Sequence, residues 1–202
     1  MMKNLIPFMA LVISMLLNVH VGNAQTNSLV PEELEMFRTE VKHRVNRFQM
    51  YLTFIGSKKN DVDTKQAYVK QALKLFIGNG EDYKDVYGNL QPAVRTQISS
   101  KNKKSKSWRK TKAYLNSLIN LSYQEVEISW ADVCRVGEFH KVRDGLYVTT
   151  VTISQHFVGY RDSGSYSDTT DKTITVYLEE EVTTVGGQYR VLFGDIEVIQ
   201  TY

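Results

Sequence analysis

Hydrophobic residues in the first half of the chain recur every three or four positions, which is the spacing of one helical face. The strongest such run predicts a helix over residues 31–55, with an apolar face formed by Leu34, Phe37, Val41, Val45, Phe48, Leu52 and Ile55. A second helix is predicted to start at Asp63, which has the capping-box spacing to Gln66, and to end at Gly78 and Gly80. A third is predicted over residues 107–120.

The second half of the chain changes to an alternation of apolar and polar residues, the period of a strand. It predicts four strands over residues 123–130, 146–160, 172–182 and 188–199, with a tight hairpin at Gly186-Gly187. Two further short strands are expected within residues 81–100. Helices followed by hairpin-linked strands indicate an α+β fold, in which the helices pack on one face of an antiparallel sheet.

This order of elements resembles the NTF2-like family, in which a cystatin-like cone wraps a bent antiparallel sheet around a long first helix. The resemblance is topological and spans nearly all of residues 25–202, which we expect to form a single domain. It implies three N-terminal helices packed on a bent antiparallel sheet and a pocket at the open end of the cone. Members of the family use that pocket for small ligands, for catalysis or for dimer and partner binding.

The first 24 residues have the pattern of a signal peptide: a positive charge at Lys3, an apolar run and small residues before a cleavage site. We expect cleavage between Ala24 and Gln25. The absence of a cysteine at this site excludes the lipid attachment of bacterial lipoproteins. The expectation is an exported protein of Gram-negative type, periplasmic or secreted, that does not span the membrane after cleavage. A retained N-terminal anchor is the alternative.

Composition excludes several classes of function. Twenty-five basic against 22 acidic residues give a charge of +3, too nearly balanced to indicate a nucleic-acid partner. The single cysteine, Cys134, allows no disulfide within the chain and is expected to be a buried, inert thiol. The histidines of residues 25–202 have no metal-ligand spacing, and we expect neither a metal nor a cofactor.

Enzymes of this fold place carboxylates and tyrosines inside the cone, where apolar walls set the pKa of a carboxyl group. Asp132 and Asp195 are the acids most deeply embedded in apolar sequence and are therefore the catalytic candidates. The alternative is structural: Asp132 in a turn and Asp195 beside a glycine bulge at Gly194.

Residues 101–112 hold seven basic side chains around one tryptophan. Such a stretch can bind an anionic envelope surface, and the binding candidates here are Lys103, Lys104, Lys106 and Trp108. The alternative is a solvated loop that runs into a helix with Trp108 turned inward.

Gln155, Phe157 and Gly159 lie in a segment that is similar to the Gln-x-Val-x-Gly wedge of cystatin peptidase inhibitors, with Phe157 in place of valine. The resemblance implies binding to a peptidase, although the Pro-Trp pair of cystatins is missing. Alternatively, these residues only shape the hairpin before residues 161–164, with Asp168 and Lys172 flanking the return of the chain.

The function predicted first is an exported, non-catalytic binding protein. It takes a small amphipathic ligand in the cone pocket, or a protein partner on an exposed apolar sheet face over residues 147–157 and 172–178, a homodimer being the simplest form. An isomerase-type or hydrolase-type enzyme of the NTF2-like family is the alternative. A cystatin-like peptidase inhibitor is the second alternative.

Overall fold

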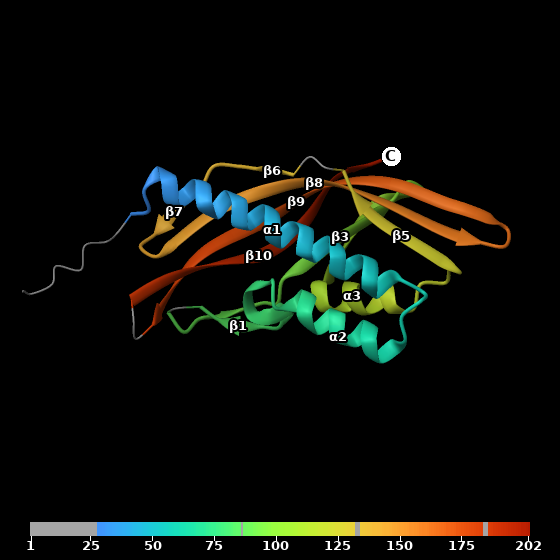
Figure 1. Cartoon of the computed structure of the whole chain (residues 1–202), viewed down its shortest axis with the longest axis horizontal. Coiled ribbons are helices and arrows are strands. Elements are labelled where there is room, and N and C mark those ends of the chain that lie inside the picture. Colours follow the sequence, from blue (N-terminus) through green and yellow to red (C-terminus); the bar gives the residue numbers. More distant parts are fainter. Residues whose placement is uncertain (1–27, 86, 132–133, 184–185) are drawn as a thin grey trace, which may run out of the picture.

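Three α-helices and one large sheet make up the part of the chain that the computed structural model describes, residues 28–85, 87–131, 134–183 and 186–202 (Figure 1). The helices are α1 (Pro31–Gly56), α2 (Val62–Leu73) and α3 (Thr111–Ile119), and a short 3₁₀ helix, η1 (Ile77–Gly80), follows α2. Figure 1 shows α1 running along one face of the sheet, with α2 and α3 beside its C-terminal half.

Six strands form the main sheet in the order β4-β3-β10-β9-β8-β5, and two short strands, β6 and β7, pair with β8. The strands are β3 (Arg95–Ser100), β4 (Lys103–Lys110), β5 (Glu125–Trp130), β6 (Arg135–Val136), β7 (His140–Arg143), β8 (Leu146–Arg161), β9 (Gly164–Thr183) and β10 (Gly186–Thr201). A separate hairpin joins β1 (Tyr83–Lys84) to β2 (Leu90–Gln91).

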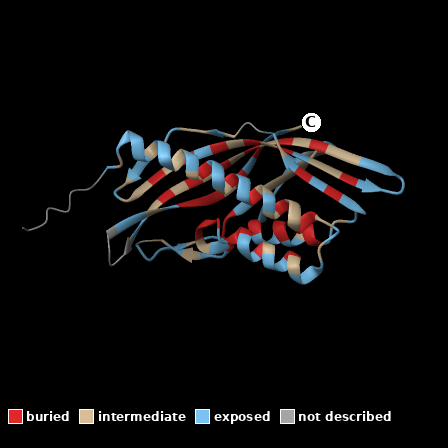
Figure 2. Ribbon diagram, in the orientation of Figure 1, coloured by how far each residue is buried: buried red, intermediate tan, exposed pale blue. Residues whose placement is uncertain are grey.

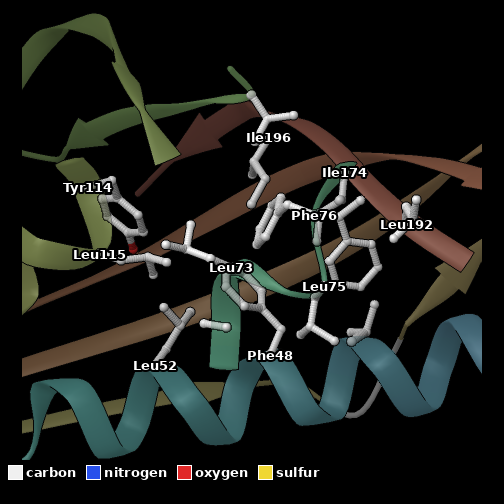
Figure 3. Close-up of a cluster of buried hydrophobic side chains, with 14 of the residues drawn as sticks. Phe48, Leu52, Leu73, Leu75, Phe76, Tyr114, Leu115, Ile174, Leu192 and Ile196 are labelled. Carbon is white, nitrogen blue, oxygen red and sulfur yellow. The ribbon is translucent and has the colours of Figure 1, made fainter. Parts of the chain in front are cut away.

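The core lies between α1 and the sheet. Phe48 is 2% exposed, and its ring packs edge-on against Phe76, Phe193 and Trp130 at centroid distances of 5.2, 6.1 and 5.9 Å. Figure 3 shows Phe48 pointing from α1 toward this cluster. Along β8 and β9 buried residues alternate with more exposed ones (Figure 2), because successive side chains of a strand point to opposite faces.

These features confirm the predicted α+β class, with three helices on a bent sheet that wraps around a long first helix. The bend has a visible cause in β10, where the register with β9 shifts between Phe193 and Ile196. One strand pair differs from the antiparallel expectation, because β3 runs parallel to β10 and makes the sheet mixed.

The second helix begins earlier and ends sooner than predicted. Asp61 is its N-cap, and the Asp61 carboxylate accepts a hydrogen bond from the backbone N–H of Thr64 at 2.8 Å. Beyond the end of α2 the chain turns toward the sheet, where the Leu75 carbonyl accepts a bond from the Phe193 N–H at 2.8 Å. Pairing with a strand distant in sequence therefore ends the helix before Gly78.

Two other boundaries were wrong. The third helix starts at Thr111 and not at 107, since the preceding residues form β4, in which Trp108 pairs with Gln97 and Lys110 with Arg95. The strand predicted from 172 starts at Gly164, so β9 is 20 residues long. Asp168 and Lys172 consequently lie inside a strand, not beside a turn.

None of the helices in the described residues is long and apolar enough to cross a membrane. The predicted signal peptide and its cleavage site, Ala24 and Gln25, lie outside the described residues.

Candidate functional site

Four polar side chains follow one another along the helix-covered face of β9. Tyr166, Asp168, Thr170 and Lys172 occupy alternate positions, and the same face continues with Ile174, Val176 and Leu178 in the apolar core. Asp168 is 9% exposed and Lys172 is 7% exposed. Ionised side chains this deep are rare unless they are paired, so this end of β9 is a candidate site.

The ammonium group of Lys172 is enclosed by groups from three elements. Its Nζ donates to Oε1 of Gln155 on β8 at 2.6 Å and lies 5.7 Å from the ring centre of Tyr114 on α3. Burial lowers the pKa of Lys172 to about 8, and the negative charge of Asp168 partly opposes this lowering. Lys172 is therefore an amine whose protonation changes close to physiological pH.

A tyrosine lies beside each of the two charged side chains, Tyr114 beside Lys172 and Tyr166 beside Asp168. Burial raises the pKa of Tyr114 to about 12, so its hydroxyl stays protonated. The Tyr166 hydroxyl donates a hydrogen bond to the Asp168 carboxylate, and burial together with this bond raises the pKa of Tyr166. The group thus combines a carboxylate, an amine and two phenols, which can bind polar atoms and can exchange protons.

An inner pocket of about 220 Å³ adjoins these side chains. Its walls come from β3, α3, β8 and β9, and an apolar side is added by Leu121 and Tyr123. The lining residues are Ile98, Ser99, Ser100, Tyr114, Leu118, Leu121, Tyr123, Gln155, Phe157, Tyr166, Asp168, Thr170 and Lys172.

The inner pocket adjoins an outer basin of about 680 Å³ between the β3–β4 hairpin and the tip of the β8–β9 hairpin. The two cavities share part of their lining, namely Ile98, Ser99, Ser100, Tyr123 and Tyr166. The buried polar group and the basin are therefore neighbours across these shared residues.

Three of the predicted binding residues, Gln155, Phe157 and Gly159, lie at this site. Gln155 holds Lys172, the Phe157 ring packs edge-on against Tyr123 at 5.6 Å, and Gly159 lies directly under the same ring. A Cβ atom at Gly159 would lie 2.5 Å from Tyr123, so glycine is required for this approach.

The same placement bears on the peptidase-inhibitor alternative. An inhibitory wedge projects from a hairpin into a peptidase. Gln155 and Gly159 are instead buried in β8 (Leu146–Arg161), which pairs with β5 on one side and β9 on the other, and this argues against that alternative. The segment is similar to cystatins in its sequence, but Gln155 and Gly159 are not exposed on the surface.

The candidates in the lysine-rich segment lie elsewhere. Lys106 donates to the backbone carbonyls of Val198 and Ile199 at 2.6 and 3.0 Å, and Trp108 is stacked under the guanidinium of Arg95 at 4.8 Å. Lys103 and Lys104 belong to β4, but their side chains lie outside the described part. Neither Lys106 nor Trp108 lines the two cavities.

Of the catalytic candidates, Asp132 lies outside the described residues. Asp195 is in the β10 bulge beside Gly194, where its carboxylate accepts from the Arg95 N–H at 2.7 Å and pairs with the Arg95 guanidinium at 3.1 Å. This is the structural alternative named for Asp195, and the residue is absent from both cavity linings.

The expected apolar sheet face for a partner was wrong. The outward residues of β8 and β9 pair as Thr150 with Thr175, Thr152 with Thr173 and Ser154 with Asp171. On the same outward face Val148 lies opposite Tyr177, and both are half-buried, whereas Val151 and Ile174 face the core and are fully buried. Residues 147–157 and 172–178 hold none of the large exposed apolar side chains.

The described residues hold no group of three or more side chains suited to a metal ion. Cys134 is half-buried, and burial raises the pKa of its thiol, which disfavours the reactive thiolate.

Sequence comparison found no family model and no curated protein that matches the chain. Among solved structures, the fold is similar to a "Putative Scytalone Dehydratase" from Novosphingobium aromaticivorans DSM 12444. The TM-score is 0.43 at 8% identity, with 85% of this chain and 90% of that chain covered. We draw no conclusion from a likeness at this level.

Tyr114, Tyr166, Asp168 and Lys172 were missed as site residues. The sequence contains no signal for the three on β9, because the alternation of apolar and polar residues that ends at Leu178 begins only at Ile174. Residues 167–173 are all polar, and a polar residue that faces inward cannot be told from a loop residue in sequence.

Proposed function

We propose that this protein binds a small amphipathic ligand in the inner pocket, with the buried polar group of β9 as its recognition element. The observation that carries this proposal is the burial of Lys172, Gln155 and Asp168 in the wall of a cavity that shares part of its lining with the basin. Lys172 donates a hydrogen bond to Gln155, and Asp168 accepts one from Tyr166, so each charged group has a partner inside the fold. An ammonium group can donate three hydrogen bonds and a carboxylate can accept several, so a bound molecule can add further bonds to both groups.

The lining indicates the chemistry of the inner end of the ligand. Lys172 and Asp168 contribute one positive and one negative charge to the same lining, so the pocket favours an uncharged polar group, such as a hydroxyl, that can both donate and accept. Leu118, Leu121 and Phe157 form the opposite, apolar part of the lining. A ligand with a polar group on an apolar body satisfies both sides.

Native mass spectrometry of the gently purified protein, followed by denaturing analysis of released molecules, tests this proposal. We expect a co-purified small molecule whose occupancy falls by at least about tenfold in Lys172→Met, because the variant loses a charged hydrogen-bond donor. Lys65→Met is the matched control: Lys65 is also buried, at 5% exposure, but lies on α2 outside the pocket. A released ligand retained equally by both variants would contradict the proposed site.

We further propose that the protein acts after export, and the same spectra test this through the mass of the chain. Signal cleavage between Ala24 and Gln25 predicts a chain of residues 25–202 in protein recovered from the producing cell. A full-length chain would support the retained-anchor alternative. The spectra also report the oligomeric state, and a ligand-free dimer would favour the partner-binding alternative.

Acid–base catalysis is a second candidate, favoured by the hydrogen bond from Tyr166 to Asp168 beside Lys172. A carboxylate and a phenol in one pocket can move a proton between two positions of a bound molecule. The variant Asp168→Asn keeps the shape of the side chain and one acceptor oxygen but removes the base.

The isolated ligand is incubated with the wild type and with this variant. If the protein is an enzyme, the wild type converts the ligand, whereas the variant binds it and converts it at least about 100-fold more slowly. Unchanged ligand in both samples would reject catalysis and leave the binding proposal intact.

A further inference from the structure

The outer basin has a different chemistry from the inner pocket. Six serines contribute to its lining, together with the amide of Asn102 and the rings of Tyr123 and Tyr166. The serines come from both hairpins and are Ser99, Ser100, Ser105, Ser107, Ser163 and Ser165. Hydroxyl groups both donate and accept hydrogen bonds, so this wall is suited to a ligand that carries many hydroxyl groups itself.

The charge of the basin is positive. Arg109 enters from β4 and Arg161 from the end of β8, on opposite sides. The guanidinium of Arg161 is positioned by the backbone carbonyl and hydroxyl of Ser122, both at 3.1 Å, and lies 4.4 Å from the ring centre of Tyr123. This arrangement holds a planar donor in the lining of the basin, and guanidinium groups pair well with carboxylate and phosphate.

Carboxylates do not neutralise this charge from within the basin, since no acidic residue is among its lining residues in the described chain. The nearest acid in sequence, Asp162, accepts a hydrogen bond from Gln124 at 2.6 Å and is not in the lining. Lys101 adds a further positive charge, with its ammonium 5.3 Å from the ring centre of Tyr166. The basin therefore differs from the inner pocket, where a lysine and an aspartate lie together.

We propose that the outer basin binds an acidic saccharide, a sugar carrying a carboxylate or phosphate group, as the head group of the molecule held in the inner pocket. This inference rests on the proposed function, because the two cavities share lining residues and would hold two ends of one ligand. Arg109 and Arg161 pair with the acidic group, the serines pair with the sugar hydroxyls, and Tyr123 and Tyr166, which line both cavities, contact the part of the ligand between its two ends. A hollow of about 680 Å³ is the size of a small-molecule site, whereas a flat basic surface would favour a membrane.

Titrations of the purified protein, followed by NMR or calorimetry, test this inference with defined probes. The probes are D-glucuronate, glucose 6-phosphate, D-glucose and inorganic phosphate. We expect both acidic sugars to bind at least about tenfold more tightly than D-glucose, which lacks the acidic group, and than inorganic phosphate, which lacks the hydroxyl-rich ring. Their binding should weaken with added salt, as expected for an exposed ion pair.

Substitution of the two basin arginines tests whether the acidic sugars bind in the basin. Arg109→Gln and Arg161→Gln should each weaken glucuronate binding by about tenfold. Arg47→Gln is the matched control, because Arg47 is exposed on α1, away from both cavities, and it should bind as the wild type does. Arg109→Gln leaves the contact between Arg161 and Tyr123 in place, so it tests binding in the basin even if Arg161→Gln disturbs the hairpin.

Three results would overturn the inference: equal affinity for D-glucose and glucuronate, equal affinity for phosphate and glucose 6-phosphate, or no effect of either basin arginine. Binding of phosphatidylglycerol vesicles that depends on Arg109, in the absence of saccharide binding, would assign the basin to a membrane surface instead. The co-purified ligand and its loss in Lys172→Met test the inner pocket separately. A ligand without an acidic sugar would therefore reject this inference while leaving the proposed function standing.

Discussion

Replacing Phe48 by alanine is expected to lower the free energy of unfolding by about 3–5 kcal/mol, the usual cost of removing a large buried aromatic side chain. Phe48 is 2% exposed and contacts aromatic rings from the segment after α2, from β5 and from β10. The substitution removes a transfer free energy and leaves a cavity where α1 meets the sheet (Figure 3). Urea denaturation followed by circular dichroism measures the loss.

Met50→Ala is the control for this change. Met50 lies on the same helix two positions away, and it is 44% exposed. Truncation of an exposed side chain, with alanine favourable in a helix, should change the stability by no more than about 0.5 kcal/mol. Similar losses in both variants would contradict the packing of α1 described above.

The stability of the wild type is expected to rise by about 2 kcal/mol between pH 7 and pH 10 through the titration of Lys172. The native pKa of Lys172 is about 8, below its ordinary value of 10.5. Below pH 8 both states carry the proton, and the native state bears the full cost of a buried charge. Between pH 8 and pH 10.5 the native state has lost this proton while the unfolded chain still binds it, so the free energy of unfolding increases.

Lys172→Met isolates this effect, because methionine keeps the length of the side chain without a titrating group. The difference in unfolding free energy between wild type and variant should change by about 2 kcal/mol over this interval, in favour of the wild type at high pH. The two proteins are compared only up to about pH 10. Above this pH, tyrosines ionise in the unfolded chain while Tyr114, whose native pKa is raised to about 12, stays protonated, so the native state loses stability. Lys65→Met retains Lys172 and should keep most of the rise.

A stability difference that stays constant from pH 7 to pH 10 would show that Lys172 is not desolvated in the folded protein. It would also weaken the proposed function, which depends on a buried amine. If the rise is present, added ligand should reduce it, because a polar group bound beside Lys172 stabilises the charged amine in the native state.

The sequence determined the elements whose signal is local. The apolar stripe from Val41 to Ile55 defines the buried face of α1, and the alternation in residues 146–160 defines β8, because each pattern depends on neighbours a few positions apart. The order of these elements was enough for the α+β class, whereas the expectation of a pocket came from the resemblance to the NTF2-like family.

The tertiary structure decided the features that depend on distant partners. Residues 107–110 carry a helical spacing with Trp108, yet they form a strand because β3 offers a pairing edge. From the sequence, Lys172 was expected beside a turn, because burying the ammonium group of a lysine costs free energy unless an acceptor for its hydrogen bond is buried with it. The acceptor is Gln155, 17 residues away, and the adjoining ring of Tyr114 comes from a helix.

Sequence periodicity therefore determined the long first helix, the apolar parts of the long strands and the burial of their apolar residues. It did not determine the pocket, because the burial of Asp168 and Lys172 depends on groups brought together only by the wrapped sheet. The cost of moving a charge out of water is offset by hydrogen bonds and opposite charges from residues that are close in space. Those neighbours are set by the register of β8 against β9 and by the docking of α3, and neither is encoded in any single stretch of the chain.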